Sequence, residues 1–285
     1  EDLMVSEQNA DNSKGALWVL FMQKGASKKA NFDFSVSSQV KIAPDGVGGF
    51  LAKSAYVGPN FANALTAVGD LDGDGIQDIV SGVGRTENQT GSLWVLFMNK
   101  NGTVKDYQEI SNREGNLPYK LVEEQFFGVS VDAIGDINGD DIPDIAVGSH
   151  QDDVDGNDDG SVYTLCLNKN GTVKKAAKLG TNLGGFGFAV PEKSFMGFGI
   201  GGKVDLNQDG IGDLLIGANG DATAGDKGGA VYICILDSNG EATRTEKLTP
   251  ADTLVKDYYD AGDSFGSSIV SLGDINGDGY PDLAI

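Results

Sequence analysis

The sequence has little of the chemistry on which most enzymes rely. Among its 285 residues there is one histidine, His150, and there are two cysteines, Cys166 and Cys234. Neither cysteine has an obvious base partner, and no Gly-x-Ser-x-Gly elbow occurs. Aspartate pairs could in principle cleave glycosides, but the evident ones belong to the repeated loops described below. We therefore expect no enzyme activity.

Long apolar runs and an excess of basic residues are also absent. No apolar run approaches the roughly 18 residues that span a membrane, and no signal peptide opens the chain. The balance of 21 basic against 42 acidic residues gives a formal charge of -21, which argues against a nucleic-acid partner. The chain begins at Glu1, which suggests a processed or trimmed terminus, and it stops at Ile285 inside an expected strand.

Proline is scarce at 7 residues and glycine abundant at 42, a balance that favours short strands joined by tight turns. Cys166 and Cys234 lie in apolar runs at non-equivalent strand positions. We therefore expect buried free thiols rather than a disulfide.

Two alternating motifs organise the chain. Acidic segments such as GDLDGDGIQDIVSGV recur, and their first aspartates follow one another at intervals of 66, 69 and 69 residues. The segments begin at Gly69, Gly135, Lys203 and Gly273. A second motif, such as GSLWVLFMNKNGTVK, begins at Gly15, Gly91, Gly160 and Gly229.

One period contains four expected strands, which predicts an all-β β-propeller of four-stranded antiparallel blades. The acidic loop joins the first strand to the second. The third strand is apolar at nearly every position and so buried on both faces. The Asn-Gly pairs that follow, at 101–102, 170–171 and 239–240, predict type I′ hairpins before the fourth strand.

The pattern predicts that residues 1–285 form a single propeller domain or part of one. It predicts a half-blade at about 15–43, repeats at about 50–110, 120–180 and 190–249, and a half-blade at about 260–285. These amount to about four blades' worth of strands.

Each acidic loop is predicted to bind Ca²⁺. Its oxygen ligands alternate along one tight turn, and clustered carboxylates repel one another without a cation. The expected ligands, four side chains and one main-chain carbonyl per loop, are Asp70, Asp72, Asp74, Ile76 and Asp78; Asp136, Asn138, Asp140, Ile142 and Asp144; Asp205, Asn207, Asp209, Ile211 and Asp213; and Asp274, Asn276, Asp278, Tyr280 and Asp282.

An EF-hand is the nearest alternative, but it needs a glutamate at the twelfth loop position and flanking helices. The twelfth positions here are Ser81, Val147, Ile216 and Ile285, which excludes it. Glycine stands at the sharp turn of three loops, whereas the second loop has Asp141 there. We expect this second site to be the weakest.

These residues resemble the FG-GAP repeat of integrin α subunits and of many secreted proteins, over roughly residues 15 to 285. The name-giving pair is Phe127-Gly128, Phe198-Gly199 and Phe265-Gly266, with Phe61-Ala62 in the first repeat. The Gly-Ala-Pro element is degenerate. The resemblance implies about four structural Ca²⁺ ions and a ligand surface on the opposite face. No Arg-Gly-Asp occurs, so integrin ligand choice does not carry over.

Propellers of this family usually have seven blades, and this chain has too few strands. It is either a piece of a longer propeller, or its terminal half-blades complete one another. Completion within one chain would close a small ring, and completion between chains would build a filament.

The longest connections, near 43–60, 111–125, 180–197 and 249–263, share the face opposite the metal loops. A protein or glycan ligand is expected there. The aromatic residues of that face, which could instead pack beneath their own loops, are Tyr56, Tyr119, Phe186, Phe195, Tyr258 and Tyr259. The run 151–160 is either a solvated acidic turn or a further cation site.

Three sequons, at Asn88, Asn101 and Asn170, are possible glycosylation sites. We expect a secreted or cell-surface protein acting as a calcium-stabilised adhesion or ligand-binding module. One alternative is a structural subunit of an extracellular filament or matrix. A third is an accessory propeller of a secreted polysaccharide-acting enzyme.

Overall fold

The computed structural model describes residues 2–8, 14–24, 34–50, 61–86, 88–252, 256 and 258–285. Tyr56 and the rest of the segment 51–60 lie outside the described residues. The elements in the described part are β-strands and two short 3-10 turns, η1 (Val47–Gly49) and η2 (Pro250–Asp252). None of its helical segments has the length and apolar character to cross a membrane.

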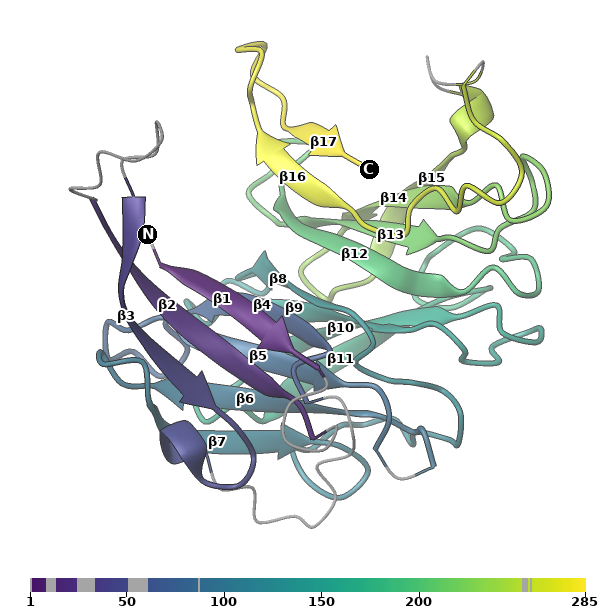
Figure 1. Cartoon of the computed structure of the whole chain (residues 1–285). Helices are drawn as coiled ribbons and strands as arrows, with labels where there is room; N and C mark the ends of the chain where they lie inside the picture. The colour runs from purple at the N-terminus through teal and green to yellow at the C-terminus, as the bar shows by residue number, and fades with distance from the viewer. Residues whose placement is uncertain are drawn as a thin grey trace.

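Three complete blades form the body of the molecule (Figure 1). Each is a four-stranded antiparallel sheet whose strands follow chain order, as the repeats predict. The first is β4 (Ala64–Gly69), β5 (Asp78–Val83), β6 (Ser92–Met98) and β7 (Val104–Ile110). The second is β8 (Val131–Gly135), β9 (Asp144–Ser149), β10 (Ser161–Leu167) and β11 (Val173–Leu179). The third is β12 (Met196–Val204), β13 (Asp213–Ala218), β14 (Ala230–Leu236) and β15 (Ala242–Leu248).

Smaller sheets lie at the two ends. The carboxyl-terminal hairpin, β16 (Val270–Gly273) and β17 (Asp282–Ala284), is the expected pair of first and second strands. The amino-terminal sheet contains β2 (Ala16–Lys24) and β3 (Phe34–Ile42), but β1 (Leu3–Glu7) also pairs with β2. This sheet therefore has one strand more than the half-blade that the repeats predict, and β1 takes the second-strand place.

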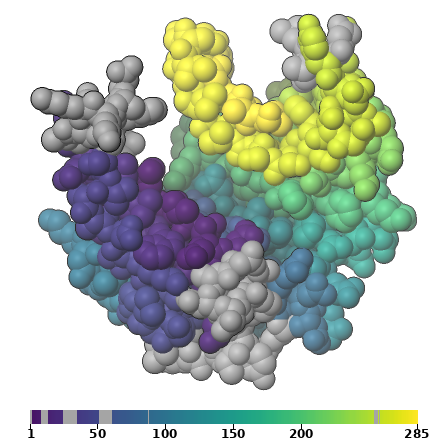
Figure 2. All heavy atoms as spheres, viewed as in Figure 1, coloured from purple at the N-terminus to yellow at the C-terminus, as the bar shows by residue number. Residues whose placement is uncertain are grey.

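The blades stand side by side in an open arc. Their innermost strands contact one another in the order β4, β8, β12, β16. Lys203 Nζ, in the third blade, donates a 2.8 Å hydrogen bond to the carbonyl of Ala67 in the first blade. Figure 2 shows the amino-terminal sheet in purple and the carboxyl-terminal hairpin in yellow on either side of an opening. No described sheet is closed into a barrel.

The third strand of each blade contributes many residues to the core. Every residue of β6 and of β10 is buried, because the strand is covered on both faces by the neighbouring blades. This confirms the expectation from their continuous apolar sequence. Cys166 and Cys234 are buried and unbridged, as expected.

Glycine at the start of the third strand forms the joint between blades. Gly91 makes a parallel bridge to Phe127 of the next blade, and a Cβ on Gly91 would lie 2.0 Å from the Phe127 carbonyl oxygen. Gly229 meets Phe265 in the same way, and Gly15 places its Cα against Phe61. Main-chain atoms thus contact directly, which no other residue type permits.

In the third repeat the joint is formed by residues other than the predicted FG pair. Gly160 bridges to Met196 rather than to Phe198, and a Cβ on Gly148 would lie 2.0 Å from the Gly197 carbonyl oxygen. Met196-Gly197 therefore occupies the place that we assigned to Phe198-Gly199. The motif is displaced because methionine substitutes for phenylalanine as the buried side chain.

The Asn-Gly hairpins differ from the expected type I′ turns. Gly102 has φ 80°, but Asn101 does not have the positive φ that a type I′ turn requires. The Gly102 N–H bonds to the Asn99 carbonyl at 2.8 Å, and the strand register shifts at Met98. These are three-residue loops with a left-handed glycine and a bulge. The bulge matters for the metal loops below.

Candidate metal sites and the opposite face

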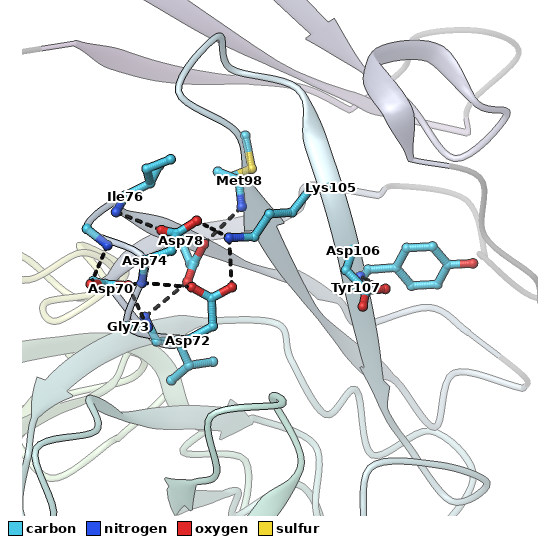
Figure 3. Close-up of polar contacts among 12 residues, drawn as sticks. Asp70, Asp72, Gly73, Asp74, Ile76, Asp78, Met98, Lys105, Asp106 and Tyr107 are labelled. Atoms are coloured by element: carbon cyan, nitrogen blue, oxygen red, sulfur yellow. Dashed lines mark hydrogen bonds and ion pairs between the residues drawn. The ribbon is translucent and has the colours of Figure 1, made fainter.

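The first acidic loop gathers its carboxylates around one point (Figure 3). One oxygen from each of Asp70, Asp72 and Asp78 lies within 4.8 Å of the other two. Asp70 accepts hydrogen bonds from the N–H groups of Gly73, Asp74 and Gly75 at 2.8 to 2.9 Å. The loop therefore folds around its first aspartate, and its converging oxygens are of the hard kind that a divalent cation prefers.

Asp78 fastens the loop to the core of the blade. Its side chain is fully buried and accepts hydrogen bonds from Leu71 N at 3.0 Å and Met98 N at 2.9 Å. Burial raises its pKa. A carboxylate held in this environment gains from a nearby cation, because the cation offsets the cost of burying its charge.

The second and third loops repeat this arrangement. Asp144 accepts from Ile137 N and Leu167 N, and burial raises its pKa to about 6. Asp213 accepts from Leu206 N and Leu236 N, and burial raises its pKa as well. In the fourth loop Asp282 accepts from Ile275 N at 2.9 Å.

The fifth loop residue has a common role in all four loops. Its carboxylate accepts a hydrogen bond from the N–H of the residue whose carbonyl we predicted as a ligand. The pairs, with N to O distances of 2.8, 3.0, 2.8 and 2.9 Å, are Ile76 to Asp74, Ile142 to Asp140, Ile211 to Asp209 and Tyr280 to Asp278. Ligation by those carbonyl groups remains a prediction.

Asparagine replaces the second aspartate in the last three loops. The Asn138 amide nitrogen donates to Asp144 at 3.2 Å, Asn207 donates to Asp209 at 2.8 Å, and Asn276 donates to Asp278 at 3.1 Å. The amide donors thus face the carboxylates. Turning each amide over would present its oxygen in the same place, so the donor set fits a cation.

Lysine ammonium groups lie among the candidate ligands of the first two loops. Lys105 Nζ is paired with both Asp72, at 2.7 Å, and Asp74 (Figure 3), and these carboxylates raise the pKa of Lys105. Lys174 Nζ lies 2.6 Å from Asp140 and lowers the pKa of that carboxyl. In both loops an ammonium group thus lies against carboxylates that were predicted to bind Ca²⁺.

Two loop positions carry left-handed residues other than glycine. Asp141 has φ 63°, as its place in the turn predicts. Gln208 in the third loop has φ 61°, where the other loops have Gly73, Gly139 and Gly277. Sequence reasoning overlooked Gln208, although the missing glycine in its motif marked the position.

The opposite face holds the long connections, and hollows lie between its blades in the described part of the chain. One of about 650 Å³ between the first and second blades is lined by Asn88, Asn112, Lys120 and Glu123 among others. The second, of about 310 Å³ between the second and third blades, is lined by His150, Phe195, Phe198, Asn219, Lys227 and Ser264 among others.

The aromatic residues of this face mostly pack beneath their loops. Phe186 is fully buried, and Tyr119 packs edge-to-face against Tyr163 with ring centroids 5.3 Å apart. Phe195 is half-buried, and the Tyr259 hydroxyl donates to the Ala224 carbonyl. Tyr258 is the exception, with 84% of its surface exposed.

The acidic run 151–160 contributes buried charge that sequence reasoning did not predict. Asp152 is 4% exposed and its carboxylate lies 2.6 Å from Lys178 Nζ, and the Tyr163 hydroxyl also bonds to it. Asp159 is fully buried and accepts from Val154 N. The run is therefore only partly the solvated turn that we considered.

The sequon residues Asn88, Asn101 and Asn170 are exposed. Asn101 and Asn170 each accept a 2.7 Å hydrogen bond from the threonine hydroxyl of their own sequon. Glycosylation at these sites stays a prediction.

Comparisons with known proteins agree with this geometry. Residues 70–147 match the FG-GAP-like repeat model and residues 265–285 match the FG-GAP repeat model. Integrin alpha-V of Gallus gallus is 32% identical over 242 residues, covering 81% of this chain and 20% of that protein. Integrin alpha pat-2 of Caenorhabditis elegans is 32% identical over 238 residues, covering 77% of this chain and 17% of that protein.

The blades, their acidic loops and the FG joints define a β-propeller of the FG-GAP type. The chain belongs to the FG-GAP, integrin α-like family, which confirms the resemblance. It spans a fifth or less of the length of the integrin chains cited above.

Proposed function

We propose that this chain is an extracellular or cell-surface propeller, stabilised by calcium in its acidic loops, that binds a protein ligand for adhesion. The convergence of Asp70, Asp72 and Asp78 within 4.8 Å carries the calcium part of the proposal. The similarity to integrin α chains supports the adhesion part. Each loop joins the first strand of a blade to the second, so a bound cation would hold the two strands together.

Calcium removal tests the metal part. A ligand that binds only the folded state, and whose concentration is 100 times its Kd, adds about 2.7 kcal/mol to the free energy of unfolding. For a chain of this size that corresponds to about 5 to 10 °C in melting temperature for each occupied site. We expect chelation by EDTA to lower the melting temperature and added CaCl₂ to restore it. An unchanged melting temperature in EDTA would rule out structural calcium.

Ligand binding is assigned to the face with the two hollows, because long loops on a rigid scaffold commonly carry recognition. Cell attachment to surfaces coated with the calcium-loaded chain tests this. We expect Lys120→Glu and Lys227→Glu to reduce attachment, and Lys100→Glu, on the metal-loop face, to leave it unchanged. Equal attachment by all three variants would contradict the assignment.

Assembly through the terminal strands is a second candidate, favoured by exposed apolar residues on the carboxyl-terminal hairpin. Leu272 and Ile275 are 46% and 70% exposed, whereas their counterparts in the second blade, Ile134 and Ile137, are 0% and 2% exposed. Because β1 already takes the second-strand place in the amino-terminal sheet, the hairpin could add only its first strand there.

Light scattering over a range of protein concentrations tests this assembly. We expect the mass to rise with concentration and Ile275→Lys to suppress the rise. A monomer at all concentrations would exclude assembly through these strands.

A further inference from the structure

The same backbone bulge recurs in the three complete blades, and in the first two it places a lysine against the acidic loop. In the first blade the strand pairing passes from Phe97↔Asp106 to Met98↔Val104, which leaves Lys105 out of register. The shift recurs at Cys166 and Leu167 in the second blade and at Ile235 and Leu236 in the third. Bulges re-aim the side chain that they extrude.

The residue in that place differs between the blades. It is Lys105 in the first and Lys174 in the second, and both pair with aspartates of their own loops. In the third blade it is Thr243, whose hydroxyl donates to the Ile235 carbonyl at 3.2 Å. In the described part of the chain, no lysine or arginine ion pair involves the third loop's Asp205, Asp209 or Asp213.

The lysines contact the carboxylates that a metal ion would use. Lys105 bridges Asp72 and Asp74, and Lys174 holds Asp140 (Figure 3 shows the first of these). An ammonium group satisfies part of the negative charge of the loop, and it must withdraw or suffer repulsion when a divalent cation arrives. The first loop has four expected ligand aspartates against one lysine, whereas the second has three against one.

From this arrangement we propose that Lys105 and Lys174 are built-in counter-cations that compete with calcium. They hold the first two loops together without metal and lower the calcium affinity of those loops. The third loop, which has Thr243 instead, binds calcium more tightly, and the second loop is the weakest of the three. The inference rests on the proposed calcium binding and adds an order of affinity to it.

Calorimetric titration of the metal-free chain with CaCl₂ provides the test. We expect Lys105→Thr and Lys174→Thr each to tighten one site by about tenfold or more, since each removes a charge within a few ångströms of the cation. Thr243→Lys should weaken one tight site by a similar factor. Lys100→Thr is the matched control, because it removes the same charge from the tip of the hairpin that precedes Lys105, and it should change nothing.

Thermal melting gives a second readout, because the effect of the variant on the melting temperature should depend on whether calcium is bound. Without metal, Lys105→Thr should melt below the parent chain, and at saturating calcium the difference should vanish or reverse. If Lys105→Thr does not fold without metal, Thr243→Lys still tests the competition between lysine and calcium, because it removes no ion pair. Calcium binding with unchanged or weakened affinity in the lysine variants would overturn the competition. Absence of calcium binding in every variant would instead overturn the proposed function.

Discussion

Lys247 Nζ lies 2.7 Å from a carboxylate oxygen of Asp221, whose side chain is fully buried. The Tyr232 hydroxyl bonds to the same oxygen at 3.2 Å, and the lysine lies over the tyrosine ring. Burial acts to raise the pKa of Asp221, but hydrogen bonds from Lys247 and Thr223 outweigh it and hold the pKa below its usual value. Asp152, Tyr163 and Lys178 repeat this arrangement in the second blade.

Breaking this pair should be costly. Lys247→Met leaves a buried carboxylate without its partner, which typically costs about 3 to 5 kcal/mol. Chemical denaturation of the calcium-loaded chain measures this loss of unfolding free energy, with Lys100→Met as the exposed control. A loss below about 1 kcal/mol would show that the pair is already solvated. The first blade has Thr86, Trp94 and Glu109 at the corresponding places, so the pair is not required for the fold.

Replacing Asp141 by glycine should stabilise the second loop. A left-handed residue with a Cβ costs about 1 kcal/mol or slightly more, and Asp141 has φ 63°. The converse change, Gly75→Asp in the first loop, should cost a similar amount, because a Cβ there meets nothing within 4 Å. Unfolding free energies of the metal-free chain should move in opposite directions. A stabilising Gly75→Asp would contradict the argument.

Alanine at two glycines separates close packing from backbone strain. Gly160→Ala would place its Cβ 2.3 Å from the Met196 carbonyl oxygen, so the joint between the second and third blades must open. We expect a loss of about 3 kcal/mol or more. Gly210→Ala has the same backbone conformation, with φ 87°, but open space around it, and should cost about 1 kcal/mol. Equal losses would show that main-chain contact does not determine the joint.

His150 should stay neutral well into the acid range. It packs among Phe126, Phe195 and Phe198, and burial lowers its pKa to about 4. The unfolded value is about 6.5, so its contribution to stability is complete above about pH 6.5 and is lost as the pH falls toward 4. Because it is the one histidine of the chain, its NMR signals are unambiguous. Titration near pH 6.5 would mean that the ring is solvated.

The blades and their acidic loops could be predicted because each depends on residues close in sequence. The loop from Asp70 to Asp78 carries its own candidate ligands, and the unbroken apolar run of β6 indicates its burial. β1 could not be predicted, because Leu3–Glu7 belongs to neither motif and is fixed only by pairing with β2.

The missed features depend on residues far apart in the chain. Lys105 reaches Asp74 only because of a bulge that no residue type announces. The aromatic surroundings of His150 come from separate segments, Phe126 before β8 and Phe198 in β12. In the third repeat the FG pair was predicted two residues too late. Met196 takes the place of phenylalanine there, and a Phe-Gly pair follows two residues later.

The joint at Gly91, Gly160 and Gly229 recognises main chain rather than side chains. At the joint itself the side chains of the two blades are therefore not matched to each other. The faces of the blades are, because buried side chains of neighbouring blades share one core. A change of side chains on one blade face therefore requires a matching change in the next blade, whereas the joint can stay as it is.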